Sequence, residues 1–142
     1  MRRYLHDLVR QSARDCTTAT ALTSGTTTLT YGELWQHIKA VGAGLQRLGL
    51  TRGDRVGIFL DKRIETVTGI FGTSAASGVF VPINPLLRSR QVNYILDDCD
   101  VRVLITNKER YDLLRDGLVN LPALEHIVLI NGIPTSETNG GH

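Results

Sequence analysis

The fold of this chain is decided from residue 29 onward, by the stretch Leu29-Thr30-Tyr31-Gly32-Glu33-Leu34. Thr30 and Glu33 have the spacing of a capping box, in which each side chain accepts a hydrogen bond from the other residue's backbone N–H group at a helix start. Apolar residues then recur at helical spacing, at Leu34, Ile38, Val41, Leu45 and Leu48. Gly49 follows, where helices often end on a left-handed residue. The sequence therefore predicts a helix over residues 30–48.

Downstream of this helix, short apolar runs alternate with helical patterns. The patterns predict strands at residues 56–60, 79–81, 101–105 and 127–130, with helices at 64–74, 89–99 and 111–119. Thr106 and Glu109 repeat the capping-box spacing, and Ser89 is placed to cap the helix that follows it. The strands are apolar throughout, which is typical of parallel strands covered on both sides. We therefore expect an α/β fold with an open, mainly parallel sheet and helices on both faces.

Upstream of residue 29, the sequence predicts a short helix and a β-hairpin. Residues 4–14 have a weak helical pattern, and two threonine-rich runs at 18–23 and 26–30 flank Ser24-Gly25. Threonine favours strands and glycine permits a tight turn, so these runs predict an N-terminal β-hairpin. From Asn131 onward no periodic pattern remains. We expect an α/β subdomain over residues 1–130 and a polar loop or tail over residues 131–142.

Composition and charge exclude several functional classes. The chain has 142 residues, enough for a domain with its own core, and 16 Lys and Arg residues stand against 14 Asp and Glu. These charges are scattered and aromatic residues are few, so we expect no nucleic-acid partner. No run approaches the roughly 18 apolar residues of a membrane span, and no signal peptide follows Arg2 and Arg3. A cytoplasmic location is the expectation.

Few residues form a pattern that indicates chemistry. Cys16 and Cys99 lack a CxxC partner, and Cys99 falls on the apolar face of a predicted helix, which favours a buried, reduced thiol. Glu33 and His37 share a helical face, but no third metal ligand lies nearby in the sequence. No Ser/His/Asp or Cys/His arrangement can be assembled from the spacing.

Three other groups have both a functional and a structural interpretation. Gly42 and Gly44 lie inside a predicted helix, which favours helix packing over a dinucleotide fingerprint. The triplet Asp61-Lys62-Arg63 follows a predicted parallel strand at the edge where ligands collect, although helix capping and solvation are the simpler interpretation. Asp97, Asp98 and Asp100 cluster at a helix end, which indicates a solvated terminus.

Four stretches together resemble the opening of AMP-forming acyl-CoA synthetases, a superfamily that includes adenylation domains and luciferases. They are residues 29–34, 49–57, 78–85 and 94–98, in matching order and spacing. The sequences of residues 60–67 and 80–87 are most similar to those of the acyl-CoA ligases associated with bacterial exosortase systems. The resemblance runs from about Leu5 to Leu114, and it identifies the chain as the N-terminal part of a larger adenylate-forming fold.

The resemblance implies ATP-dependent activation of a carboxylic acid, such as a fatty acid, to an acyl-adenylate, followed by transfer to a thiol. ATP, Mg²⁺ and coenzyme A are implied for the complete enzyme, and none of them for this chain. The four matched stretches form scaffold, whereas the family's phosphate loop, adenine motif, ribose-binding aspartate and C-terminal lysine have no counterpart here. We therefore name no catalytic, cofactor-binding or metal-binding residue, and we expect the chain alone to be inactive.

One stretch imitates the family's phosphate loop, Thr23-Ser24-Gly25-Thr26-Thr27-Thr28. Thr28 stands in place of the loop's second glycine, the loop's proline and lysine are absent, and the stretch precedes residues 29–34 instead of following them. These departures favour the hairpin.

Two alternatives remain at the level of the sequence. The chain can be part of an adenylation domain that loads a carrier protein, or a free-standing α/β interaction module without an enzyme. In either ligase the remainder of the fold is the expected partner, along with the acyl substrate. Because that remainder would cover apolar surface, we also expect this chain to associate with itself.

Overall fold

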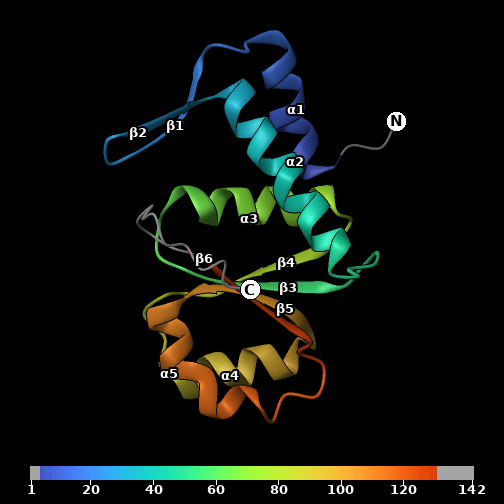
Figure 1. Ribbon diagram of the computed structural model, residues 1–142, viewed down its shortest axis with the longest axis vertical. Helices are drawn as coiled ribbons and strands as arrows, with labels where there is room; N and C mark the ends of the chain where they lie inside the picture. Colours follow the sequence, from blue (N-terminus) through green and yellow to red (C-terminus); the bar gives the residue numbers. More distant parts are fainter. Residues whose placement is uncertain (1–3, 131–142) are drawn as a thin grey trace. The chain divides into compact units, whose positions relative to one another are not determined.

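The computed structural model describes residues 4–130, which divide into two compact units. The first unit comprises residues 4–53 and 62–78, and the second comprises residues 54–61 and 79–130. The first holds α1 (Leu5–Asp15), β1 (Thr20–Ser24), β2 (Thr27–Thr30), α2 (Tyr31–Arg47) and α3 (Ile64–Ala75) (Figure 1). The second holds β3 (Arg55–Phe59), β4 (Val79–Pro82), α4 (Ser89–Asp98), β5 (Val101–Asn107), α5 (Lys108–Leu118) and β6 (His126–Ile130).

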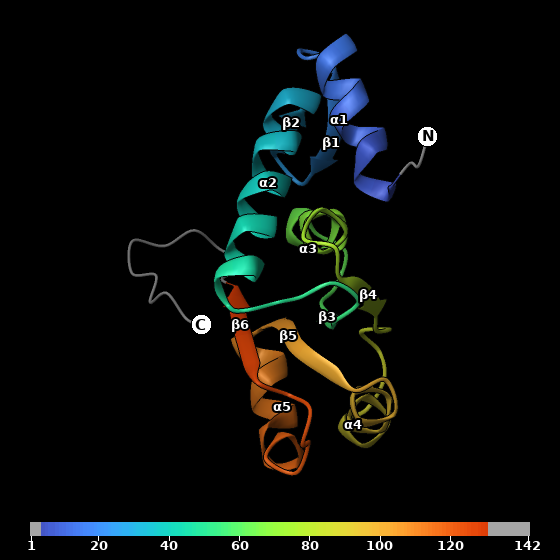
Figure 2. The ribbon, with the colours of Figure 1, turned by 90° about the vertical axis from the view of Figure 1, so that its right-hand side faces the viewer.

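The second unit is a four-stranded parallel sheet in the order β4-β3-β5-β6. Helices α4 and α5 lie together on one side of it, as Figure 2 shows. The core between sheet and helices consists of buried, mostly large apolar side chains, namely Phe59, Ile83, Val92, Leu96, Val101, Leu104, Leu114 and Leu118. Gly57 leaves room for them, since a Cβ there would lie 3.1 Å from Leu96 and 3.2 Å from Val101.

Charged side chains join three strands of this sheet at the ends where the strands begin. The Arg102 guanidinium on β5 binds Asp54, which directly precedes β3, and its Nε donates to Glu125 at 3.0 Å, directly before β6. The carboxylates are 48 and 23 positions from Arg102 in the sequence. Arg102 therefore fixes strands that are distant in the chain, and the two carboxylates raise its pKa.

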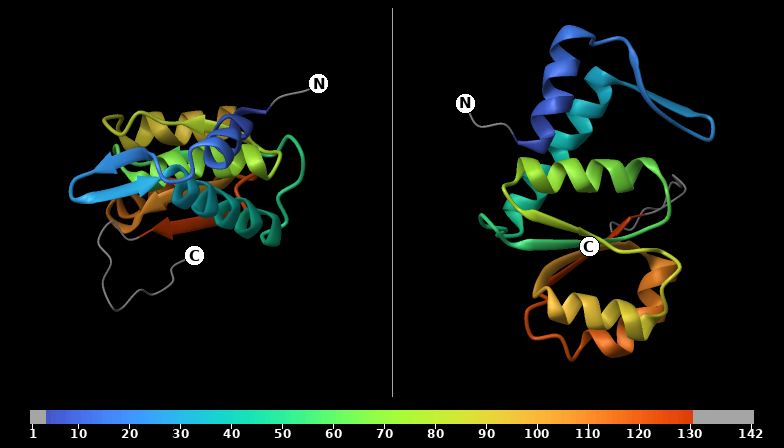
Figure 3. Two further views of the ribbon diagram at one scale, coloured as in Figure 1. Left: turned by 90° about the horizontal axis from the view of Figure 1, so that it is seen from above. Right: turned by 180° about the vertical axis from the view of Figure 1, so that it is seen from behind.

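The first unit is built on helices and a hairpin. Helix α1 packs on α2 and α3, and the antiparallel hairpin β1–β2 projects from the helices, as Figure 3 shows. Its core is the cluster of Val9, Leu29, Leu34 and Ile38. Helices α2 and α3 approach closely at glycines, because a Cβ on Gly42 would lie 3.3 Å from Ala75, and one on Gly72 would lie 2.6 Å from the Cβ of Val41. This contact confirms the prediction that Gly42 serves helix packing, whereas the same prediction for Gly44 is wrong, because a Cβ there would meet no atom within 4 Å.

The first predicted capping box is confirmed and the second is wrong. Thr30 Oγ1 accepts from the Glu33 N–H group at 3.1 Å, and Glu33 Oε1 accepts from the Thr30 N–H group at 2.9 Å. Thr106, however, is still in β5, fully buried, and donates to the Phe59 carbonyl at 2.7 Å. Asn107 caps α5 instead, its Oδ1 accepting from the Arg110 N–H group. Strand β5 runs further than predicted, so the cap moves by one residue.

Other boundaries shift by a few residues without changing the architecture. Ser89 is the first residue of α4 and not its cap, a position that Arg88 occupies. Gly49 has φ +91°, which confirms the left-handed residue after α2. The α/β class, the parallel sheet flanked by helices and the N-terminal hairpin are confirmed. The predicted tail over residues 131–142 lies outside the described residues.

Candidate functional site

The hairpin turn does not fit a nucleotide phosphate. Gly25 takes φ +59° in an exposed turn, and Thr23 pairs with Thr28 across the two strands. The segment carries no basic side chain, and its turn leads into strand β2 and not into the N-terminus of a helix. A triphosphate needs converging backbone N–H groups or cations. The hairpin interpretation of residues 23–28 is therefore confirmed.

The remaining candidates from the sequence do not come together. Glu33 and His37 are both exposed on α2, and within residues 4–130 no three His, Cys, Asp or Glu side chains gather as a metal site would require. The Asp97, Asp98 and Asp100 side chains are exposed at the end of α4, as predicted. Asp61 and Arg63 are half-buried, and Lys62 between them is exposed. In this part of the chain, the residues therefore do not fit Mg²⁺.

The two thiols differ from each other in exposure. Cys16 is exposed, whereas Cys99 is half-buried against the core of the second unit, and both are free. The prediction of a buried thiol holds for Cys99 only in part. The residue packs against the core, but its position at the C-cap of α4 leaves part of the side chain in contact with solvent.

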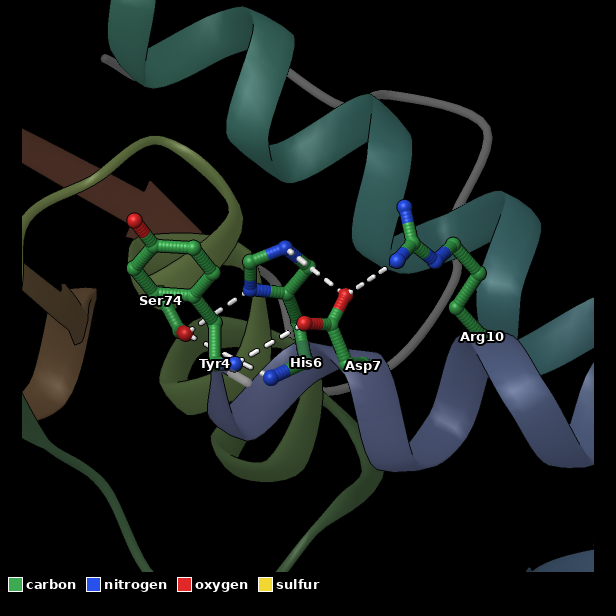
Figure 4. Close-up of polar contacts among 5 residues, drawn as sticks. All are labelled: Tyr4, His6, Asp7, Arg10 and Ser74. Carbon is green, nitrogen blue, oxygen red and sulfur yellow. Dashed lines mark hydrogen bonds and ion pairs between the residues drawn. The ribbon is translucent and has the colours of Figure 1, made fainter. Parts of the chain in front are cut away.

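Figure 4 shows a polar cluster in the first unit that the sequence did not indicate. It joins α1 to α3 within the first unit. His6 Nδ1 lies 2.9 Å from Ser74 Oγ, which also accepts from the His6 backbone N–H group at 3.4 Å. These residues are 68 positions apart, so no local pattern could have revealed the contact.

Asp7 organises the other side of this cluster. Its Oδ2 accepts from the Tyr4 N–H group at 2.8 Å, which caps α1, and its Oδ1 binds Arg10 at 2.6 Å. The same Oδ1 lies 3.7 Å from His6 Nε2, beyond hydrogen-bond range. The imidazole thus has a hydroxyl at one nitrogen and a carboxylate, already paired with an arginine, near the other.

Aromatic rings enclose the imidazole of His6. The Tyr4 ring stacks at a centroid distance of 5.7 Å, and the Trp35 ring lies nearly parallel at 6.3 Å. Only 15 % of the His6 side chain is exposed. Burial is the largest influence on the pKa of His6 and lowers it; Asp7 opposes this shift and Arg10 adds to it.

Ser74, His6 and Asp7 include the residue types of a hydrolytic triad, but the surroundings lack what such chemistry needs. A triad requires backbone N–H groups that can hold an oxyanion beside the nucleophile. Around the end of α3 these groups are occupied, since Ala76 donates to the Gly72 carbonyl and Ser77 to that of Ser74. The cluster is therefore a connection between helices and not a nucleophilic site.

The second unit contains hollows whose walls are partly apolar and partly polar. One of about 440 Å³ lies beside α5 and β6, where Leu118, Val119 and Leu129 share the wall with Arg115 and Glu125. Another of about 260 Å³ lies at the start of α4, beside Phe59 and Leu114. Near the second, the Arg110 guanidinium stacks over the Phe59 ring at 5.5 Å. Neither hollow gathers residues that act as acid and base.

No helix within residues 4–130 has both the length and the apolar character that a membrane crossing demands.

Comparison with known proteins places these observations in a family. Residues 8–140 match the AMP-binding enzyme family. Syringomycin synthase SyrB1 of Pseudomonas syringae pv. syringae is 30 % identical over 129 residues, which are 86 % of this chain and 21 % of the synthase. Tyrocidine synthase 3 of Brevibacillus parabrevis is 33 % identical over 104 residues, or 73 % of this chain and 2 % of that protein.

Solved structures agree with the sequence comparison. The anthranilate CoA ligase AuaEII, in complex with anthranoyl-AMP, superposes with a TM-score of 0.87 at 33 % identity, over 94 % of this chain and 26 % of the ligase. VinN superposes with a TM-score of 0.76 at 30 % identity, over 88 % of this chain and 33 % of VinN. The chain therefore spans about a third or less of these relatives. Adenylate-forming ligases of both kinds, acyl-CoA ligases and adenylation domains of peptide synthetases, are homologous to it. This chain belongs to the AMP-binding enzyme family.

Proposed function

We propose that this chain forms the N-terminal scaffold of a ligase that activates a carboxylic acid with ATP and transfers the acyl group to a thiol. The observation that carries the proposal is the match to the anthranilate CoA ligase, at 33 % identity and a TM-score of 0.87 over 94 % of the chain. The matched part is 26 % of that ligase. Because the phosphate loop, adenine motif, ribose-binding aspartate and C-terminal lysine of such ligases have no counterpart in this sequence, we place the catalytic residues in the rest of the complete protein.

Within the complete protein, residues 1–130 would serve as an α/β subdomain. ATP, Mg²⁺ and coenzyme A are proposed for the longer protein alone, because the exposed hairpin turn does not fit a triphosphate and residues 4–130 gather no carboxylates for a metal. We further propose a cytoplasmic location, where ATP and coenzyme A are available.

The acyl substrate is the finer part of the proposal. The sequences of residues 60–67 and 80–87 resemble the exosortase-associated acyl-CoA ligases and therefore favour a fatty acid as the substrate. The relatives include proteins whose structures hold other acids: AuaEII with anthranoyl-AMP, and VinN with L-aspartate at 30 % identity. An aromatic acid or an amino acid is therefore the alternative substrate class.

A second function is favoured by the curated relatives. These include syringomycin synthase, tyrocidine synthase and a hybrid PKS-NRPS synthetase, at 28–33 % identity. In an adenylation domain of this kind the acceptor would be a carrier protein. A third possibility is an α/β module without catalysis. For the chain alone we propose self-association, on the ground that the Leu86 and Val119 side chains are exposed.

The test begins with the complete reading frame that contains this chain. The purified product is assayed for ATP-dependent pyrophosphate release with fatty acids, aromatic acids and amino acids, each offered with coenzyme A or a phosphopantetheinylated carrier protein. Turnover with an acid and coenzyme A supports the ligase, and turnover only with the carrier protein supports the adenylation domain. A reading frame that ends after His142, with a product that activates no acid, favours the non-catalytic module.

The chain by itself is assayed in parallel with the same substrates. We expect pyrophosphate release at background, since its described residues offer no cradle for a triphosphate. Reproducible ATP-dependent turnover by the pure 142-residue chain would overturn the scaffold role.

A further inference from the structure

We propose that His6, in its neutral form, is a pH-responsive latch that holds helix α1 against helix α3. The latch lies wholly within the first unit and does not depend on the enzymatic activity proposed above. Figure 4 shows the His6 ring with Ser74 on α3, the flanking Tyr4 ring, and Asp7 with Arg10. The Trp35 ring on α2 completes the latch.

The proposed latch uses one tautomer of the neutral imidazole. Ser74 Oγ accepts from the His6 backbone N–H group at 3.4 Å and lies 2.9 Å from His6 Nδ1. In the latch the Ser74 hydroxyl donates to Nδ1, and Nε2 carries the ring proton on the side of Asp7 Oδ1 at 3.7 Å.

Protonation of His6 disturbs this arrangement. In the protonated ring Nδ1 carries a hydrogen, so the Ser74 hydroxyl could no longer donate to it. A positive charge would also appear in a side chain that is only 15 % exposed. On α1, Asp7 favours the imidazolium, but its Oδ1 is already bound to Arg10 at 2.6 Å, whose charge opposes it. On α2, the Lys39 ammonium lies 5.9 Å from the Trp35 ring that stacks on the imidazole. From α3 the contact is with the uncharged Ser74.

The direction of the pH effect follows from linkage. Burial lowers the pKa of His6 in the docked state below the usual 6.5, so the released helix binds a proton more tightly than the docked one. Docking is therefore at full strength above pH 6.5 and weakens as the pH falls from about 6.5 to the lowered pKa. Release would uncover Val9 and Ala13, the two buried residues of α1.

The chain carries its own reporter, because Trp35 is its single tryptophan and stacks on His6. Trp35 fluorescence would be followed from pH 8 to pH 5 in the 142-residue chain, together with hydrogen exchange of the α1 amides corrected for intrinsic rates. We expect one transition with its midpoint below pH 6.5, and α1 exchange that accelerates up to about tenfold per pH unit across it. Exchange in β3 and β5 should not change over that range.

Three variants separate the latch from other causes. His6→Gln should abolish the fluorescence transition and the pH dependence of α1 exchange. His37→Gln is the matched control, since His37 is exposed and two positions from Trp35, and it should leave both signals unchanged. Ser74→Ala should raise α1 exchange even at pH 8, because it removes the acceptor for the His6 N–H group and the hydroxyl that contacts Nδ1 of the ring.

Several results would overturn the latch. One is a His6 proton NMR titration with a midpoint at or above 6.5, which can be measured on the wild-type chain even if a variant fails to fold. Another is a fluorescence transition that persists in His6→Gln or disappears in His37→Gln. A third is α1 exchange that shows no change between pH 8 and pH 5.

Discussion

In the first unit, helices α2 and α3 approach each other at Gly42 and Gly72, whereas in the second unit α4 and α5 rest on the sheet through large aliphatic side chains. The first contact brings backbones close and leaves no space for an added methyl group at Gly72. The second fills a wider gap with side chains such as Leu96 and Leu104. Substitutions in opposite directions should therefore harm the two units: truncation in the second, enlargement in the first.

Truncation in the second unit should have the largest effect. Leu96→Ala removes a side chain that is 1 % exposed in the core of α4, α5 and the sheet, and we expect a loss of about 2–5 kcal/mol in the free energy of unfolding. Urea denaturation measures the loss. Leu113→Ala is the control, because Leu113 is 68 % exposed and its truncation should stay within about 0.5 kcal/mol. Equal losses for the two variants would contradict the assigned core.

Enlargement in the first unit should come next. In Gly72→Ala the new Cβ would lie 2.6 Å from the Cβ of Val41, so we expect a cost of about 1–3 kcal/mol in urea denaturation. Adding Val41→Ala to Gly72→Ala removes the opposing side chain and should recover part of the loss, as a double-mutant cycle would measure. Strict additivity of the two substitutions would show that α2 and α3 do not meet there.

The cap of α2 gives a smaller effect. Thr30→Ala removes the hydroxyl that accepts from the Glu33 N–H group, and we expect a loss of about 0.5–2 kcal/mol. Thr30→Ser keeps an acceptor and should recover most of the stability. In a complete, active ligase, Thr30→Ala should lower the melting temperature while turnover stays within a few-fold of wild type. A hundredfold loss of kcat with unchanged melting, equal to about 2.7 kcal/mol, would place Thr30 in the catalytic machinery instead.

Gly44→Ala should have the smallest effect, and it should raise the free energy of unfolding where the other substitutions lower it. Gly44 lies on the same helix as Gly42, but a Cβ there would meet no atom within 4 Å. Gly44→Ala should therefore stabilise the chain by about 0.5–1 kcal/mol through helix propensity alone. Thermal unfolding of Gly42→Ala and Gly44→Ala side by side measures the difference. Destabilisation by Gly44→Ala would mean that this face of α2 is not open.

Local sequence patterns predicted the fold well. They failed where a side chain binds a partner that is distant in the sequence. Thr30–Glu33 and Thr106–Glu109 have the same spacing, but only the first is a capping box. The Thr106 hydroxyl is used by the Phe59 carbonyl, 47 positions away, and β5 continues through it. The sequence of residues 106–109 does not indicate the hydrogen bond from Thr106 to Phe59. For the same reason a capping box can be proposed from spacing, but not the residue at which the preceding strand ends.

The candidate site shows the same limit more sharply. That the hairpin turn is no phosphate loop could be predicted, because the loop's lysine and second glycine are replaced in the sequence itself. The cluster of His6 and Ser74 could not be predicted, because His6 lies in the first turn of α1 and Ser74 in the last turn of α3. Neither has a neighbour in the sequence that indicates the other. Only the packing of α1 on α3 brings them together.

The strand β3 belongs to the second unit, although the chain returns to the first unit to make α3 before the rest of the sheet follows. During synthesis, β4 follows α3 and provides a partner for one edge of β3, whereas the other edge must wait until β5 has been made as far as Thr106. The β3 residues Val56, Ile58 and Phe59 are almost wholly buried in the native state. A short apolar strand with an unpaired edge is a site for chaperone binding or aggregation. The interleaved order of the two units thus makes the nascent chain vulnerable for as long as β3 lacks β5.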